Sequence, residues 1–269
     1  MQHLEDRVVV VTGAGSGIGR ASAIAFAKAG MHVVVADVDG AGMATTCQEI
    51  EAVGRRAYAV LTDVSSAGDV RALYEQTLSR AGSVHVLMNN AGIVRFGAAL
   101  ELSDDDWKRV IDIDLWGVIH GCRTFGPHLV AQREGHIVNT ASLAGIAGVS
   151  GCASYVAAKF GVVGLSEALR WELAISRVGV TVVCPGLVRT GLASNAGAAH
   201  VIKAMDKFGA KPDKLAAQVV RAVKRNQARV LFGFEPKLAD GLRRMAPSAL
   251  EQVGMAMAAA NRKGAELPR

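Results

Sequence analysis

The sequence contains a glycine-rich stretch near its start, Thr12-Gly13-Ala14-Gly15-Ser16-Gly17-Ile18-Gly19. It follows an apolar, β-branched run at residues 7–12 and precedes a segment with helical spacing at residues 17–29. Glycines allow a sharp turn between the strand and the helix, and they let a diphosphate approach the backbone. The free N–H groups and the positive dipole at the start of the helix then attract the anion. The stretch therefore predicts a diphosphate-binding turn after a first strand.

Outward from this turn, short β-branched runs alternate with segments of helical spacing. The predicted strands cover residues 7–12, 31–36, 56–61, 84–88, 136–140, 180–184 and 229–232. The predicted helices cover residues 17–29, 40–53, 66–81, 103–132, 154–177 and 213–226. The early strands are apolar almost throughout, which is typical of parallel strands buried on both faces. We predict an α/β fold with a single doubly wound (Rossmann) parallel sheet of seven strands, helices on both faces and a helical C-terminal tail.

The 269 residues contain no repeat and no linker of the kind that joins domains. One domain over residues 1–233 is therefore predicted, followed by a helical extension at 234–269 that packs on the domain or on a neighbouring subunit. Residues 185–212 have weak periodicity and are predicted to form a substrate loop or lid. The extension carries an apolar stripe with Arg243 and Arg244 beside it, interrupted by Pro247. Its members are Leu238, Leu242, Met245, Leu250, Val253 and Met257.

The composition excludes several classes of protein. A chain that is 51% hydrophobic and 20% charged is not disordered, and no run of apolar residues is long enough to span a membrane. No secretory signal is visible at the N-terminus, so a soluble, cytoplasmic protein is expected. The four cysteines are far apart and the seven histidines lack metal-site spacing, so neither disulfides nor a metal are predicted. Aromatic residues make up 5% and do not interleave with basic ones, which argues against nucleic-acid binding.

The formal net charge of +6 is unevenly distributed. Residues 1–202 hold 16 Lys and Arg against 18 Asp and Glu, whereas residues 203–269 hold 14 against 6. The positive surplus therefore belongs to the last quarter of the chain. The favoured interpretation is a helix packed on its own domain or on a second subunit, and the alternative is peripheral contact with an anionic membrane.

The second predicted strand ends close to Asp37, eighteen residues after Gly19. A carboxylate at this position accepts hydrogen bonds from the ribose hydroxyls of a dinucleotide and repels a 2′-phosphate. Neither Ser16 nor Val38 supplies a cation that would offset this repulsion. The sequence therefore favours NAD over NADP.

A tyrosine and a lysine occur at Tyr155 and Lys159, at the start of a predicted helix. Their spacing of four residues puts the phenol and the ammonium on one helix face, where the ammonium is expected to lower the pKa of the tyrosine. Ser142 lies just beyond the fifth predicted strand, at the carboxyl edge of the sheet. Ligands of doubly wound sheets bind at this edge.

Taken together, these motifs resemble the short-chain dehydrogenase/reductase superfamily in its single-domain form, over residues 6–232. The resemblance rests on the motifs 12–19, Asp63-Val64, Asn89-Asn90-Ala91-Gly92, Ser142, Tyr155-x-x-x-Lys159 and Pro185-Gly186-Leu187-Val188-Arg189-Thr190. It implies that Tyr155 is the general acid and base, that Ser142 polarises the substrate oxygen, and that Lys159 binds the nicotinamide ribose and assists Tyr155. Relatives pair through two long helices, so a homodimer or homotetramer is implied.

The resemblance also implies a binding site for NAD. The diphosphate is expected on the glycine turn, the adenine beside the third strand, and the carboxamide beside the motif that starts with proline. The implied cofactor-binding residues are Gly13, Gly15, Ser16, Gly17, Ile18, Gly19, Asp37, Asp63, Val64, Asn90, Ala91, Gly92, Tyr155, Lys159, Pro185, Gly186, Val188 and Thr190.

Asp114 departs from the pattern, because many relatives have an asparagine there. In the family that residue helps to hold, through its backbone carbonyl, a water in a proton relay to the lysine. A backbone role survives the change to aspartate, so Asp114 is retained as a catalytic candidate. A buried carboxylate near Lys159 would also shift the pKa of the lysine.

The resulting hypothesis is an NAD(H)-dependent oxidoreductase that interconverts a secondary alcohol and a ketone. An apolar or alicyclic substrate is expected, because the residues predicted to reach it are mostly apolar: Ile93, Val94, Ile146, Val149, Leu187 and Leu192. The alternatives are a reductase or dehydratase that acts on another carbonyl substrate, and a non-catalytic NAD-binding regulatory protein.

Overall fold

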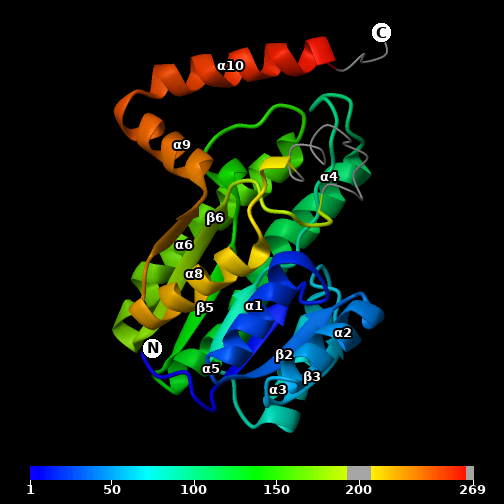
Figure 1. Ribbon diagram of the computed structural model, residues 1–269, viewed down its shortest axis with the longest axis vertical. Helices are drawn as coiled ribbons and strands as arrows, with labels where there is room; N and C mark the ends of the chain where they lie inside the picture. Colours follow the sequence, from blue (N-terminus) through cyan, green and yellow to red (C-terminus); the bar gives the residue numbers. More distant parts are fainter. Residues whose placement is uncertain (193–206, 265–269) are drawn as a thin grey trace.

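The computed structural model describes residues 1–192 and 207–264, and it contains one seven-stranded parallel sheet (Figure 1). The strand order is β3-β2-β1-β4-β5-β6-β7, so the chain reverses its direction of winding between β1 and β4. This confirms the predicted doubly wound fold. The strands are β1 Val8–Thr12, β2 His32–Asp37, β3 Ala57–Leu61, β4 Val86–Asn89, β5 Gly135–Thr140, β6 Val178–Pro185 and β7 Arg229–Phe232.

Helices cover both faces of the sheet. Alternate residues of β1 and β2 face opposite sides, so Val9 and Val33 join one core cluster while Val10 and Val34 join the other. The first cluster includes side chains of α1 Gly17–Lys28, α2 Gly40–Glu51 and α8 Pro212–Arg225. The second includes side chains of α3 Ala67–Ala81, α5 Gly117–Ala131 and α6 Ala153–Leu173. The runs of valine in the sequence are thus explained by burial on two faces.

The long helix predicted at residues 103–132 is divided into three parts. It begins as α4 Asp104–Ile111, continues as a π-helical turn η1 Asp112–Trp116, and ends as α5. The N–H of Gly117 bonds to the carbonyl of Asp112, five residues earlier. Single π-helical turns within α-helices occur often at functional sites. This turn contains Asp114, whose side chain is fully buried.

Two helices follow β7 and form the C-terminal extension. They are α9 Phe234–Met245 and α10 Pro247–Gly264, and α10 crosses one end of the molecule in contact with α9 (Figure 1). Within the apolar stripe predicted for this extension, Met245 is 86% exposed and Val253 46%, whereas Leu242 and Leu250 are partly buried. Among the residues that the structure describes, no helix is long and apolar enough to cross a membrane.

The segment predicted as a substrate loop is described only at its two ends. The N–H of Arg189 donates to the carbonyl of Ala210 at 3.0 Å, and the N–H of Ala210 donates to the carbonyl of Leu187 at 3.0 Å. The two ends of the segment therefore lie side by side. The middle of this predicted loop lies outside the described residues.

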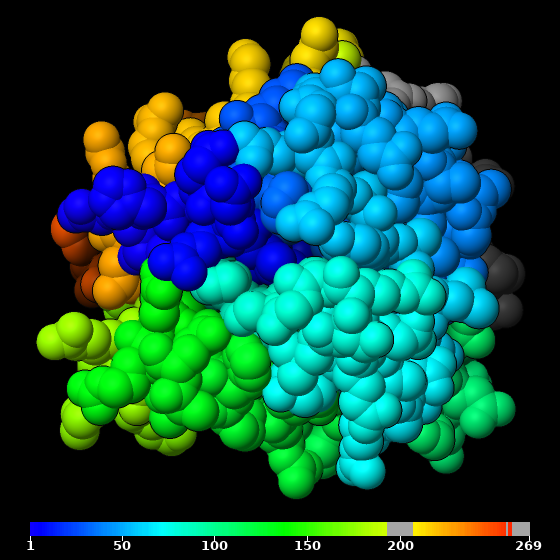
Figure 2. Space-filling view, turned by 90° about the horizontal axis from the view of Figure 1, so that it is seen from below, coloured from blue at the N-terminus to red at the C-terminus, as the bar shows by residue number. Residues whose placement is uncertain are grey.

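At the end of the molecule seen in Figure 2, residues from the N-terminal, middle and green-coloured parts of the chain lie side by side. Polar contacts link the segments that precede the strands. Arg7 forms an ion pair with Glu134 at 3.2 Å and a hydrogen bond with His85 at 3.0 Å. These residues precede or begin the strands β1, β4 and β5. The residues singled out by the motifs lie at the other edge, where the strands end.

Candidate active site

The glycine turn is shaped by close backbone contacts. Gly13 and Gly17 have positive φ angles of 64° and 53°. A side chain at Gly13 would place its Cβ 2.7 Å from Cα of Ala91, and one at Gly19 would collide with the carbonyl oxygen of Gly13. Only glycine fits these positions, and the result is a turn at the start of α1 that an anionic group can approach.

The segment after β4 is fastened to this turn. The Asn90 side chain donates from Nδ2 to the carbonyl oxygens of Thr12, at 3.1 Å, and Gly13, at 3.3 Å. In return, the Thr12 hydroxyl accepts the N–H groups of Asn90 and Ala91 at 3.0 and 3.2 Å. Gly92 is also crowded, because a Cβ there would lie 2.8 Å from Oδ2 of Asp114. The residues predicted to line the cofactor crevice therefore lie beside the glycine turn.

Asp37, at the end of β2, points its carboxylate at the same turn. Oδ2 accepts the N–H of Gly15 at 2.7 Å, while Oδ1 accepts the N–H groups of Val38 at 2.7 Å and Asp39 at 3.1 Å. Three backbone donors thus fix the orientation of this carboxylate. A dinucleotide with its diphosphate on the turn would meet the carboxylate at its adenosine end.

Sequence reasoning missed a cation in this region. Arg20, on α1, donates to the carbonyl of Gly15 and, at 3.1 Å, to the hydroxyl of Thr46. In the sequence, only positions 16 and 38 were considered as places for a cation near the ribose. Arg20 instead reaches the turn from the helix that follows it. Its spacing from Ser16, four residues along a helix, is the signal that would have revealed it.

The other predicted adenine contacts lie beyond β3. Asp63 accepts the N–H and the hydroxyl of Ser65 at 2.9 and 2.7 Å, so its carboxylate closes a local turn. Val64 is 7% exposed, and its carbonyl bonds to the ring of His120 at 3.1 Å. The structure thus places both residues at the carboxyl end of β3, with Asp63 in a local turn and Val64 in contact with α5.

The last predicted cofactor segment begins at the end of β6. The N–H of Gly186 bonds to the carbonyl of Phe232 at 2.8 Å, and Val188 is 3% exposed. A Cβ at Gly17 would lie 3.2 Å from the methyl carbon of Thr190, so the segment returns to the glycine turn. A polar cavity of about 510 Å³ is lined there by Gly17, Arg20, Ala21, Ile24, Glu49, Arg189, Thr190, Gly191, Pro212 and Asp213.

Lys159 lies at the centre of a buried polar cluster. Its Nζ is 2.9 Å from Oδ2 of Asp114 and donates to the carbonyl of Thr140 at 3.1 Å. The two side chains of this ion pair are 3% and 0% exposed. The other carboxylate oxygen of Asp114 accepts the N–H of Ile93 at 2.8 Å. The side chain of Asp114, and not only its backbone, is therefore part of the cluster.

Tyr155 and Ser142 complete the cluster. Nζ of Lys159 lies 5.3 Å from the centre of the Tyr155 ring, which is the proximity predicted from the four-residue spacing. Ser142 caps a short 3₁₀ turn, η2 Leu143–Gly145, where its hydroxyl accepts the N–H of Ala144 at 3.2 Å. Both Ser142 and Tyr155 are partly exposed, unlike Lys159 and Asp114. The two groups that a substrate would need to meet are thus the accessible ones.

The electrostatics differ from the expectation in one respect. Burial raises the pKa of Tyr155 and the Asp114 carboxylate adds to this, so the lowering effect of Lys159 is outweighed. Lys159 lowers the pKa of the phenol, as the spacing predicts, but burial and Asp114 leave the pKa of Tyr155 raised overall. Burial also lowers the pKa of Lys159, but the charges of Asp114 and Tyr155 outweigh it and the pKa is raised. Burial raises the pKa of Asp114, and Lys159 opposes this shift.

The apolar residues predicted to reach a substrate fall into three groups. Val94 and Ile146 are buried, at 8% and 3% exposed. Val149 is 40% exposed and lines a cavity on the far side of α6. Ile93, Leu187 and Leu192 are partly exposed. Only the last group combines partial exposure with the apolar character that the prediction of substrate contact requires.

Chemically, the cluster presents a phenol, a hydroxyl and an ammonium held by a carboxylate. A phenol exchanges a proton with a substrate oxygen, and a hydroxyl hydrogen-bonds to the same oxygen. Oxidation or reduction at the carbon requires a hydride carrier, and the adjacent glycine turn with its free backbone N–H groups and the Asp37 carboxylate suits a dinucleotide.

Comparison with known proteins agrees with this arrangement. The sequence model of the short chain dehydrogenase family matches residues 7–200. The putative oxidoreductase SadH of Mycobacterium tuberculosis is 38% identical over 263 residues, which cover 94% of this chain and 95% of that protein. Cyclohexanol dehydrogenase of Acinetobacter sp. is 36% identical over 233 residues, or 86% of this chain and 92% of that enzyme.

A solved structure is similar along almost the whole chain. It is the crystal structure of a short-chain dehydrogenase/reductase from Burkholderia phymatum in complex with NAD. The TM-score is 0.86 at 33% identity, and the match covers 93% of this chain and 96% of that one. Matches of this extent, in sequence and in structure, show that the chain belongs to the short-chain dehydrogenase/reductase family.

Proposed function

We propose that the protein is an NAD(H)-dependent oxidoreductase that interconverts a secondary alcohol and a ketone. The observation that carries the proposal is the cluster around Lys159, which brings Tyr155 and Asp114 together beside the glycine turn. Family membership alone supports a dehydrogenase or reductase that binds a nicotinamide cofactor. The preference for NAD and the class of substrate are proposed from the side chains at the carboxyl ends of the strands.

The residues divide the chemistry between them. When the nicotinamide is bound, it accepts or donates the hydride. Tyr155 takes the hydroxyl proton of the alcohol during oxidation and returns a proton to the ketone during reduction. Ser142 holds the substrate oxygen by a hydrogen bond. Lys159 stabilises the phenolate form of Tyr155 while Asp114 keeps the ammonium in place.

The preference for NAD is supported by Asp37. Its carboxylate is held at the adenosine end of the turn by the N–H groups of Gly15, Val38 and Asp39. A fixed negative charge repels a 2′-phosphate and accepts hydrogen bonds from a ribose 2′-hydroxyl. Arg20 donates from Nε to the hydroxyl of Thr46 and from Nη2 to the carbonyl of Gly15, so two of its three nitrogens are bonded within the protein.

An apolar or alicyclic substrate is supported by two observations. Ile93, Leu187 and Leu192 are apolar, partly exposed and close in sequence to cofactor-binding motifs. One relative that covers most of the chain is a cyclohexanol dehydrogenase, whose substrate is an alicyclic secondary alcohol. A hydrophobic lining favours such a substrate over a polyol.

We also propose that two copies pair through the outer face of α6. Trp171, near the end of α6, and Ile175, on the 3₁₀ turn Ala174–Ser176 that follows it, are 76% and 85% exposed and are proposed to form an apolar patch. The resemblance implies pairing through the two long helices predicted at residues 103–132 and 154–177, and the second of these contains both residues. Trp171→Glu is expected to shift the protein from dimer or tetramer to monomer in light-scattering measurements, and Arg177→Glu, just after the 3₁₀ turn Ala174–Ser176, serves as the charge control.

The proposed function is tested with a panel of secondary alcohols and ketones assayed with NAD(H) and NADP(H) in parallel. Cyclohexanol, acyclic secondary alcohols and polyols form the oxidation panel, with Tyr155→Phe as the background control. Turnover of apolar alcohols with NAD is expected. Oxidation of polyols alone would contradict the substrate class. Binding of NAD without turnover of any compound, in either direction, would favour the non-catalytic alternative.

A further inference from the structure

We infer that Arg243, on the C-terminal helix α9, is a positioning residue for the active site. Its Nη1 donates to the carbonyl of Ile146 at 2.6 Å, and its guanidinium carbon lies 4.9 Å from the centre of the Phe160 ring. Ile146 ends the short turn η2 that Ser142 begins, and Phe160 directly follows Lys159. One side chain of the extension thus contacts both segments that carry the site. The inference rests on the proposed function.

The two segments also contact each other beneath this side chain. A Cβ at Gly145 would lie 2.7 Å from the carbonyl oxygen of Lys159, so η2 packs directly on the backbone of α6. Within the turn, the N–H of Gly145 bonds to the carbonyl of Ser142, and that of Ile146 to the carbonyl of Leu143. The side chain of Ser142, at the start of the turn, also hydrogen-bonds to Tyr155 of α6. Arg243 adds the bond that ties the end of this turn to another element.

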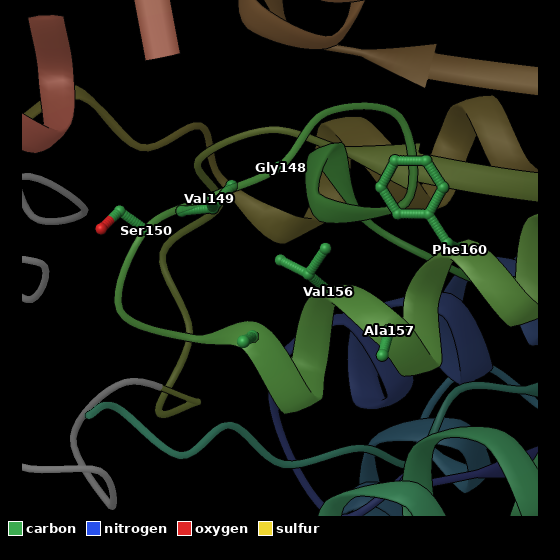
Figure 3. Close-up of a pocket in the computed structure, with 7 residues that line it drawn as sticks. Gly148, Val149, Ser150, Val156, Ala157 and Phe160 are labelled. Carbon is green, nitrogen blue, oxygen red and sulfur yellow. The ribbon is translucent and has the colours of Figure 1, made fainter. Parts of the chain in front are cut away.

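The guanidinium of Arg243 lies over an aromatic ring on α6, that of Phe160. Phe160 and Val156 line an apolar cavity of about 500 Å³ below the loop at residues 148–150 (Figure 3). At about 100° per residue, Phe160 lies about 140° around α6 from Tyr155 and about 100° from Lys159. Arg243 therefore stacks on a face of α6 adjacent to the one that carries Tyr155 and Lys159. A guanidinium over an aromatic ring is a favourable contact.

Helix α9, which carries Arg243, is held in place by ion pairs and by core packing. Asp240 forms ion pairs with Arg229 at 2.8 Å and Arg244 at 2.9 Å, and Arg229 also pairs with Glu167 of α6. Ala239 is 7% exposed and belongs to the core cluster on this side of the sheet. The helix that carries Arg243 is thus anchored to β7, to α6 and to the core.

The neighbouring Arg244 provides a matched control. It lies on the same helix and carries the same charge, but its side chain is 66% exposed and pairs with Asp240 of α9 itself. Arg243→Gln and Arg244→Gln therefore make the same change in net charge. Only the first removes contacts with the segments of Ser142 and Lys159.

The first measurement is hydrogen–deuterium exchange of peptides that cover residues 140–150, in the full chain without added ligand. Faster exchange in Arg243→Gln than in the wild type is expected. The variant lacks the hydrogen bond from α9 to the carbonyl of Ile146, so the backbone hydrogen bonds of η2 should open more often. Arg244→Gln is expected to match the wild type. Equal exchange in both variants would overturn the inference, whatever the enzymatic activity.

The second measurement is kinetic, with cyclohexanol and NAD as the probes. In Arg243→Gln, kcat is expected to fall about fivefold while the KM for NAD stays within about twofold, because a hydrogen bond from a charged donor that orders Ser142 is lost but the glycine turn is untouched. Arg243→Lys, which keeps the charge but not the planar stack, should recover part of kcat. An unchanged kcat in Arg243→Gln would overturn the catalytic part of the inference.

Failure of the proposed function gives a different result. If neither the wild type nor Arg244→Gln oxidises any alcohol of the panel, the proposed reaction is wrong, and the exchange comparison still decides whether Arg243 holds the turn. If both proteins oxidise cyclohexanol and Arg243→Gln does so equally well, the reaction is correct and Arg243 has no positioning role.

Discussion

The carboxyl edge of the sheet and the C-terminal helices place their charged groups in opposite settings. The side chains of Lys159 and Asp114 are 3% and 0% exposed, whereas those of Arg244 and Asp240 are 66% and 18% exposed. A buried pair that loses one partner leaves an uncompensated charge, while an exposed pair contributes about 0–1 kcal/mol. Changes at the edge should therefore alter both chemistry and stability. Changes in the extension should matter only where it reaches the edge.

The largest effect is expected for Tyr155→Phe. Without the phenolic hydroxyl no group at this position exchanges a proton with the substrate oxygen, so kcat should fall by about 10³-fold. The ring and its packing remain, and NAD binding followed by fluorescence should stay within about twofold of the wild type. A kcat within tenfold of the wild type would mean that another group at the edge performs the proton transfer.

The second prediction concerns Asp37→Ser. Loss of the carboxylate removes the repulsion of a 2′-phosphate and a bond to the ribose, so the ratio of kcat/KM for NADP to that for NAD should rise by about 10²-fold. The measurement is initial rates with each cofactor. Asp39→Ser, two residues further along, is the matched control and should change the ratio much less. An unchanged ratio in Asp37→Ser would refute Asp37 as the source of the preference.

Much of this edge was predictable because of the topology. Parallel strands end at the same edge, so Asp37, Asn90 and Ser142 could be assigned to it from strand ends alone. The sequence could not predict whether the Asp114 side chain contacts Lys159. The contact depends on a π-helical turn, within a segment that the sequence predicts as one continuous helix. A local sequence pattern contains no information about such a turn.

The contacts of the extension were beyond prediction for a different reason. Arg243 and Ile146 lie 97 residues apart, and their hydrogen bond depends on how α9 crosses η2. The sequence indicates an apolar stripe with arginines beside it, but it does not indicate which element receives them. Leu238 and Met245 of the stripe are 46% and 86% exposed in the single chain, so packing on a neighbouring subunit stays a prediction.

The third prediction is Asp114→Asn, which keeps the shape but removes the charge at the buried pair. The amide can accept from Ile93 or from Lys159, but its single oxygen cannot serve both donors as the two carboxylate oxygens do. Stability should fall by about 3 kcal/mol, measured by denaturant unfolding. Turnover at neutral pH should stay within about tenfold of the wild type, because Lys159 retains its bond to Thr140.

The pH profile tests the same variant independently of stability. Oxidation needs Tyr155 without its proton, so the rate rises with pH up to the pKa of Tyr155. The charge of Asp114 raises this pKa. In Asp114→Asn the pKa of Tyr155 should fall, and the acid limb of the profile should move to lower pH. A move to higher pH would mean that Lys159 has lost its proton, since a neutral lysine no longer favours the phenolate.

The smallest effect is expected from a chain that ends after Ala246 and so lacks α10. In the described residues α10 contacts chiefly α9, and its clearest contact with the core is the partly buried Leu250. Activity should stay within about twofold of the full chain, and the melting temperature should fall by about 2–4 °C.

A chain that ends after Gly233 provides the contrast, because it loses the Asp240 ion pairs and Arg243 together with α10. Its activity should fall at least as far as that of Arg243→Gln. If the chain ending after Ala246 lost as much activity as this shorter one, α10 and not α9 would be the part of the extension that supports the active site. The two truncations thus separate α9, which contacts η2 through Arg243, from α10, which contacts mainly α9. Only α9 touches the turn that begins at Ser142, so only its loss is expected to disturb the position of Ser142.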